Sequence, residues 1–217
     1  MIAGEYSQRK TGNIHDDRRL WIVCREPSPP SRESCNCSTR SLNRVFNWRS
    51  VYEPNLVYHD GKWKMWYVAG SNHEDYLVHG YSESADGRTS WSQHAVFAAA
   101  ETKMFDFCVR QRDSGFEAAF SRVWMGRGEM PPETGLWWCR AKNPSGALPD
   151  WGEPIQIMAG EDRGWHAGPW KPSLQFANDT GRRAFVFFDG MYRTADSGPF
   201  PFVFTLGCAE VELPAQT

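Results

Sequence analysis

The sequence lacks the features that mark membrane proteins and nucleic-acid-binding proteins. No apolar run approaches the roughly 18 residues of a membrane span, and the first 17 residues lack the apolar stretch of a signal peptide. We therefore expect no membrane partner and, by default, a cytoplasmic location. The 24 Lys and Arg residues nearly balance the 26 Asp and Glu residues, for a net charge of −2. Nucleic acid is not an expected partner, because such a chain has no excess of positive charge to attract phosphates.

Cysteine is also scarce, and its spacing excludes common metal and disulfide motifs. The six Cys residues form neither the CxxC pairs of a zinc site nor a dense disulfide scaffold. Cys35 and Cys37 leave a metal site there as a minor alternative. Cys108, Cys139 and Cys208 fall within apolar segments typical of strands, and we expect them to be buried thiols. We expect no cofactor.

Aromatic residues, glycine and proline are abundant. Eleven Trp, 13 Phe and 7 Tyr occur together with 19 Gly and 14 Pro. Bulky aromatic side chains fit pleated strands, and Gly and Pro favour tight turns, so this composition predicts an all-β fold. Trp-rich clefts also suit sugar rings, although most Trp residues of a sheet protein fill the core.

One pattern repeats from residue 52 onward: two strands joined by a turn, a polar loop, a third strand, then a Trp and a last strand. In the first cycle Asp60-Gly61 separates two strand-like segments, as in a two-residue hairpin turn. Trp151 takes the place in the second cycle that Trp91 holds in the first, and the third cycle lacks an obvious fourth strand. Such repetition is the signature of four-stranded β-propeller blades. We place three blades at about 52–100, 105–158 and 165–213.

The remaining sequence sets the domain organisation. Residues 1–45 are rich in Arg, Ser, Pro and Cys without a hydrophobic period, and we interpret them as an irregular N-terminal segment or a partial blade. Residues 46–217 form the propeller part. A five-bladed ring at about 50 residues per blade needs more than 217 residues. Blades are therefore missing or reduced, and the ring is open, degraded or completed by another chain. Open blade edges make self-association an option.

The blade segments resemble those of a known enzyme superfamily. EPNLVYHDGKWKMWYV and SADGRTSW are similar to blades of the five-bladed β-propeller glycoside hydrolases that include families 43, 32, 68 and 130, and the resemblance covers about 52–213. It implies a glycoside hydrolase-like protein that acts on oligosaccharides or glycosides through carboxylates in the axial funnel. The alternative is a non-catalytic carbohydrate-binding or inactive propeller. A third reading is a structural module that pairs with another chain.

The resemblance also implies site residues. Glu53, in the acidic-Pro position of the first blade, and Asp106, which opens the second, are the candidate catalytic pair, because glycosidic cleavage requires two carboxyl groups. Glu117, on the next strand, is a candidate proton donor. The third blade opens with Lys171, which departs from the acidic pattern and leaves activity in doubt.

Four residues are candidate substrate-binding residues. Trp165 and His166 lie between blades, where loops at a funnel mouth would be, although such a His more often bonds to backbone. Lys171 could bind a substrate hydroxyl or carboxylate. Asp189 follows a strand and could contact a sugar hydroxyl or merely form a turn. A single funnel-bound ion such as calcium is a further option.

Overall fold

The computed structural model describes residues 48–71, 77–92, 94–124, 129–160, 168–177, 182–193 and 202–214. Within these ranges, no helix has both the length and the apolar character needed to cross a bilayer. The N-terminal segment 1–45, with Cys24, Cys35 and Cys37, lies outside the described residues. So do Trp165 and His166.

The described chain is all-β, as the composition predicts, and its strands are joined by tight turns, longer connections and two short 3-10 helices, η1 (Ala100–Thr102) and η2 (Leu148–Trp151). The strands are β1 (Trp48–His59), β2 (Lys62–Ser71), β3 (Leu77–Ser84), β4 (Ala95–Ala98), β5 (Met104–Arg112), β6 (Gly115–Arg122), β7 (Gly135–Ala141), β8 (Ile155–Ala159), β9 (Pro169–Phe176), β10 (Arg183–Arg193) and β11 (Phe202–Glu212).

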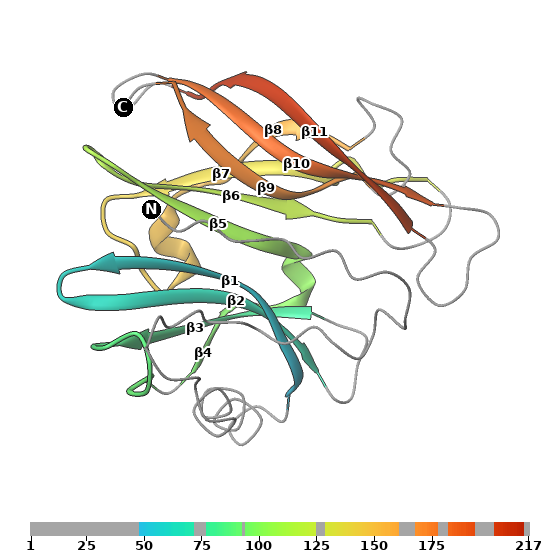
Figure 1. Ribbon diagram of the computed structural model, residues 1–217. Coiled ribbons are helices and arrows are strands. Elements are labelled where there is room, and N and C mark those ends of the chain that lie inside the picture. Colours follow the sequence, from blue (N-terminus) through green and yellow to red (C-terminus); the bar gives the residue numbers. More distant parts are fainter. Residues whose placement is uncertain are drawn as a thin grey trace, which may run out of the picture.

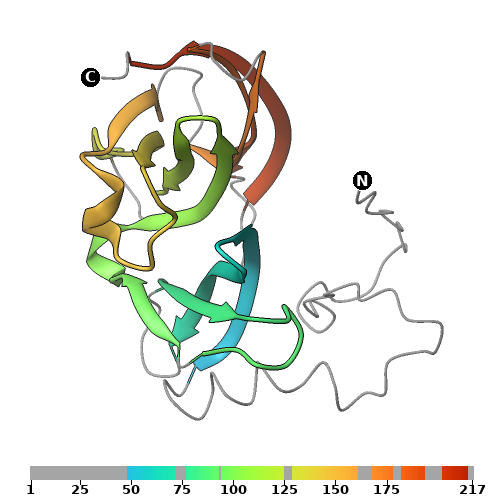
Figure 2. The same ribbon diagram turned by 90° about the vertical axis from the view of Figure 1, so that its left-hand side faces the viewer.

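The strands form three antiparallel sheets in chain order. The first sheet has the order β1-β2-β3-β4, the second β5-β6-β7-β8 and the third β11-β10-β9. Asp60 and Gly61, with φ of 50° and 75°, make the turn between β1 and β2, as a two-residue hairpin requires. In Figures 1 and 2 the second sheet lies between the other two, so the sheets follow one another as propeller blades do.

Apolar layers hold the sheets together. Trp66 and Trp151 are fully buried between the first and second sheets, where their rings meet edge to face with centroids 5.7 Å apart. Trp138 and Leu174 belong to the layer between the second and third sheets. Trp137 packs with the first layer instead, which confirms that neighbouring Trp side chains of this strand point to opposite faces.

The cysteine prediction is only partly right. Cys139 is buried, whereas Cys108 is half-buried and Cys208 is exposed. Cys208 lies on β11 opposite Phe187, which is also exposed, as are Phe204 and Leu206. These residues belong to the third sheet, and no sheet of the described chain covers this apolar surface. Self-association through open blade edges stays a prediction.

Candidate functional site

The first strand of each sheet carries a bulge at the same place. In β1, Glu53 and Pro54 lie between the pairs Tyr52–Val68 and Asn55–Trp66, so two residues face one residue of β2. In β5 and β9 the same irregularity is repeated. The bulged pairs are Glu53-Pro54, Asp106-Phe107 and Lys171-Pro172.

The first residue of each bulge has a left-handed backbone. The φ angles are 58° for Glu53, 55° for Asp106 and 53° for Lys171. This region is uncommon for residues other than glycine and costs on the order of 1 kcal/mol or more at each position. Bulges re-aim side chains out of the pleat and occur often beside active sites. Each of the three sheets therefore has a strained bulge at the same place, and each bulge orients one polar side chain.

These three side chains meet, and we call them the bulge cluster. Lys171 Nζ lies 2.5 Å from Glu53 Oε1, although the two residues belong to the third and first sheets. The carboxyl group of Asp106 lies within hydrogen-bonding reach of that of Glu53. β5, which carries Asp106, contacts both β1 and β9 and lies between them in Figure 1.

The carboxyl group of Asp106 is buried beside that of Glu53, which favours its protonated form. Asp106 is only 8% exposed. Burial raises the pKa of its carboxyl group well above the usual range, the neighbouring Glu53 raises it further, and Lys171 opposes the shift. In the described part of the chain, no other group bonds to the buried atoms Glu53 Oε2 and Asp106 Oδ2. A proton held between two adjacent carboxyl groups removes the repulsion between them.

Lys171 carries the positive charge of the cluster. Burial favours its neutral amine, but the charges of Glu53, Asp106 and Asp189 outweigh burial and raise its pKa. Its Nζ lies 4.9 Å from the ring centroid of Trp170, at cation–π distance. Lys171 therefore remains an ammonium group at neutral pH.

Asp189 lies within β10 and not after a strand, which corrects the sequence-based expectation. On β10 it is the cross-strand partner of Trp170, the residue before Lys171, and its side chain is half-buried. Burial raises the pKa of its carboxyl group, Lys171 lowers it and Glu53 raises it. The charges of Lys171 and Glu53 thus act on the Asp189 carboxyl group, which remains in contact with solvent.

One smaller side chain directly follows each bulged pair: Asn55, Cys108 and Ser173. Asn55 Oδ1 accepts a hydrogen bond of 2.9 Å from the backbone N–H of Val109, and its Nδ2 lies 3.9 Å from Cys108 Sγ. Arg110 on β5 donates to Ser173 Oγ at 3.3 Å and to the carbonyl oxygen of Leu174 at 3.1 Å. These bonds join first strands of neighbouring sheets. These polar residues could have been found in the sequence, because each lies two positions after the acidic or lysine residue of its repeat.

Glu117 lies apart from the bulge cluster. It pairs with Arg110, which is four residues further along β5 than Asp106. Its carboxylate is buried and accepts a 3.0 Å hydrogen bond from Trp138 Nε1 between the second and third sheets. This hydrogen bond gives the buried Glu117 carboxylate a structural role that requires no substrate.

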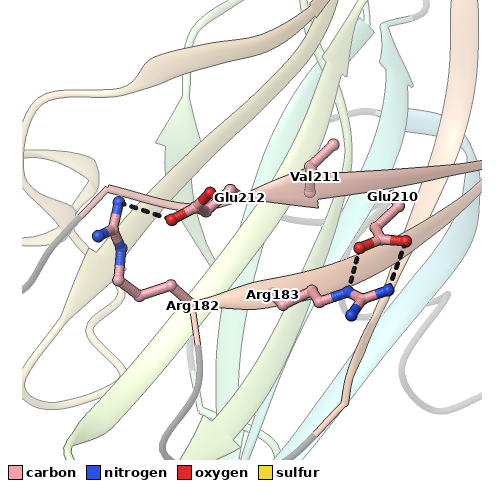
Figure 3. Close-up of a pocket in the computed structure, with 5 residues that line it drawn as sticks. All are labelled: Arg182, Arg183, Glu210, Val211 and Glu212. Carbon is pink, nitrogen blue, oxygen red and sulfur yellow. Dashed lines mark hydrogen bonds and ion pairs between the residues drawn. The ribbon is translucent and has the colours of Figure 1, made fainter.

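No group of three or more His, Cys, Asp or Glu side chains within the described ranges could hold a metal ion. A depression of about 510 Å³ lies on the third sheet, lined by Arg182, Arg183, Glu210, Val211 and Glu212. Figure 3 shows that its charged groups form ion pairs with one another, Arg182 with Glu212 and Arg183 with Glu210. Charges of this kind on an outer strand discourage unwanted strand pairing.

The raised pKa of Asp106 gives a prediction for stability. The unfolded chain ionises this carboxyl group at a lower pH than the folded protein does, so its stabilising contribution is present at acidic pH and is lost as pH rises above about 4. Asn cannot ionise and tolerates the left-handed backbone. We expect Asp106→Asn to gain about 1 kcal/mol in unfolding free energy over the wild type between pH 4 and pH 8, as measured by urea denaturation. A pH-independent difference would contradict this.

Comparison with known proteins identifies the fold. No protein-family model and no curated protein matches the sequence. The structure is similar to an alpha-L-arabinofuranosidase from Lactobacillus brevis, with a TM-score of 0.55 and 16% identity over 76% of this chain and 51% of that chain. An arabinanase from Bacillus subtilis matches with a TM-score of 0.51 and 12% identity over 74% of this chain and 50% of that one.

A third similar structure is the alpha-L-arabinofuranosidase from Podospora anserina in complex with cellotriose. Its TM-score is 0.50, at 10% identity over 81% of this chain and 58% of that chain. The chain thus spans about half the length of the first two structures. These neighbours are glycoside hydrolases with a β-propeller fold, so the predicted propeller architecture is confirmed.

Proposed function

We propose, on the premise that this chain has the fold of the propeller glycosidases, that it hydrolyses glycosidic bonds of oligosaccharides with the carboxyl groups around Lys171. The observation that carries this proposal is the convergence of the bulge cluster. Each of the three sheets has one residue with a strained, left-handed backbone at the equivalent position. The side chains of these residues come together: Lys171 forms an ion pair with Glu53, and the Asp106 carboxyl group lies beside that of Glu53. Strain retained at a polar cluster is typical of functional sites.

Glu53 is the proposed base or nucleophile. Its ion pair with Lys171 presents a carboxylate, which is the form that either activates water or attacks the anomeric carbon. Asp106 lies beside Glu53 and, in its protonated form, donates to it and keeps the Glu53 carboxylate oriented. In this proposal Asp106 is a positioning residue, and Lys171 binds both Glu53 and a substrate hydroxyl.

The substrate class follows from the neighbours. Two of the similar structures are arabinofuranosidases and one is an arabinanase. We therefore propose arabinofuranosides and arabino-oligosaccharides as the first substrates to test. An adjacent ammonium and carboxylate supply both a donor and an acceptor for sugar hydroxyl groups.

The test is turnover by the purified wild-type chain. We expect release of nitrophenol from 4-nitrophenyl α-L-arabinofuranoside and shortening of arabino-oligosaccharides. Calorimetric binding of the oligosaccharide without turnover would overturn the enzyme proposal and leave a carbohydrate-binding propeller. Absence of both binding and turnover would overturn both.

A further inference from the structure

The proposed function leaves one role open, the proton donor to the leaving group. The two carboxyl groups of a glycosidase lie about 5–5.5 Å apart in retaining enzymes and about 6.5–9.5 Å apart in inverting enzymes. Glu53 and Asp106 instead lie within hydrogen-bonding reach of each other. Two groups so close cannot flank a glycosidic bond, so the donor must be a third group.

Lys171 does not fit that role, although it occupies the third bulge. Its charged neighbours raise its pKa, so the ammonium group releases its proton even less readily than an ordinary lysine. Its Nζ is also held by Glu53 at 2.5 Å. Efficient general acids have a pKa near the working pH.

Comparison of equivalent positions in the three sheets identifies a carboxyl group that is present in the third sheet alone. In each sheet, the residue directly before the bulged pair has a cross-strand partner on the second strand. That partner is Val68 in the first sheet, Ser121 in the second and Asp189 in the third. Val68 and Ser121 are fully buried, whereas Asp189 is half-buried. The third sheet thus combines a lysine at the bulge with a carboxyl group on the neighbouring strand.

We propose that Asp189 is the proton donor of this site, a role that rests on the proposed glycoside hydrolysis. The Asp189 carboxyl group gives its proton to the glycosidic oxygen as the bond from that oxygen to the anomeric carbon breaks, and the bonding electron pair stays on the oxygen. The new bond to the anomeric carbon comes from water that loses its proton to Glu53, or from the Glu53 carboxylate itself. In the second case a water molecule then attacks the anomeric carbon, its proton passes to Asp189, and the bond to Glu53 breaks to restore the Glu53 carboxylate.

The surroundings of Asp189 suit a donor. Burial and the charge of Glu53 raise the pKa of its carboxyl group, which keeps the proton available at a higher pH, while Lys171 limits the rise. Its side chain is only partly buried and therefore in contact with solvent. Asp106, by contrast, is nearly buried and engaged with Glu53.

The test compares leaving groups in Asp189→Asn. A general acid matters for a poor leaving group and little for one that departs unaided. We expect kcat/KM for an arabino-oligosaccharide to fall about 10²–10⁴-fold, and kcat for a 2,4-dinitrophenyl α-L-arabinofuranoside to fall less than about 10-fold. The basic limb of the pH–rate profile should also disappear. Asp60→Asn, at an exposed hairpin turn, is the matched control and should leave both rates unchanged.

Two results would overturn the inference. Equal losses on both substrates would show that Asp189 is structural, and an unchanged oligosaccharide rate would show that it has no role. Asp189→Ser, which introduces the residue that the second sheet has at this position, replaces the Asn variant if that fails to fold. A wild-type chain without turnover on either substrate is the separate failure of the proposed function.

Discussion

Replacing Glu53 by glutamine should lower the rate of arabinofuranoside hydrolysis by about 10³-fold. The amide has nearly the same shape as the carboxylate and can still hydrogen-bond to Asp106, so the fold should persist. It cannot accept a proton from water or attack carbon, which are the two reactions proposed for Glu53. Initial rates on 4-nitrophenyl α-L-arabinofuranoside measure the effect, and circular dichroism checks that the variant is folded.

A matched variant separates chemistry from general damage. Glu101 is exposed in η1, and Glu101→Gln removes the same charge without touching the bulge cluster. Its rate should equal that of the wild type. A Glu53→Gln rate within 10-fold of the wild type would rule out the proposed role of Glu53.

Lowering the pH from 8 to 5 should cost the folded chain about 2 kcal/mol through His79 alone. His79 is 1% exposed, and burial lowers its pKa to about 3, against a weaker opposing bond from the Met104 backbone. In the unfolded chain the imidazole titrates near 6.5. Its contribution to stability is therefore complete above pH 6.5 and is lost as pH falls toward 3.

His94 adds to this effect. It is 2% exposed, accepts or donates a 2.9 Å bond at Nδ1 with the Tyr67 hydroxyl, and burial lowers its pKa to about 4. It should cost a further 2 kcal/mol or so at pH 5. Against a typical total stability of about 5–15 kcal/mol, two such histidines make the fold acid-sensitive.

The measurement is urea denaturation of the wild type and of His79→Met at both pH values. Met is adaptable in cores and does not titrate. The variant should be less stable at pH 8, and the gap should narrow by about 2 kcal/mol at pH 5. The opposite contribution of Asp106 is common to both proteins and cancels. A gap that stays constant or widens would contradict the assignment of His79 as a buried neutral group.

Much of the architecture could be predicted from local sequence. The Asp60-Gly61 turn, the alternating aromatic segments and the recurring strand pattern are local signals, and the structure has the hairpins and strand order that they indicate. The exposure of Cys208 could not be predicted, because it depends on whether another layer covers the third sheet. Burial of a strand residue is a property of the assembled sheets.

The candidate site could be predicted only in part. Glu53, Asp106 and Lys171 were aligned by their places in the repeat, and the structure brings them together. The close approach of the two carboxyl groups could not be foreseen, because it depends on left-handed backbone angles at two bulges. Alternation alone could not show that Glu117 faces Trp138.

The central claim is that the bulge cluster is the place where a sugar binds and reacts. The most direct measurement is a crystal structure of Glu53→Gln with an arabino-oligosaccharide bound. We predict a sugar ring over residues 53, 106 and 171, with the scissile oxygen facing Asp189. An oligosaccharide bound elsewhere on the chain, with the bulge cluster unoccupied, would contradict the account.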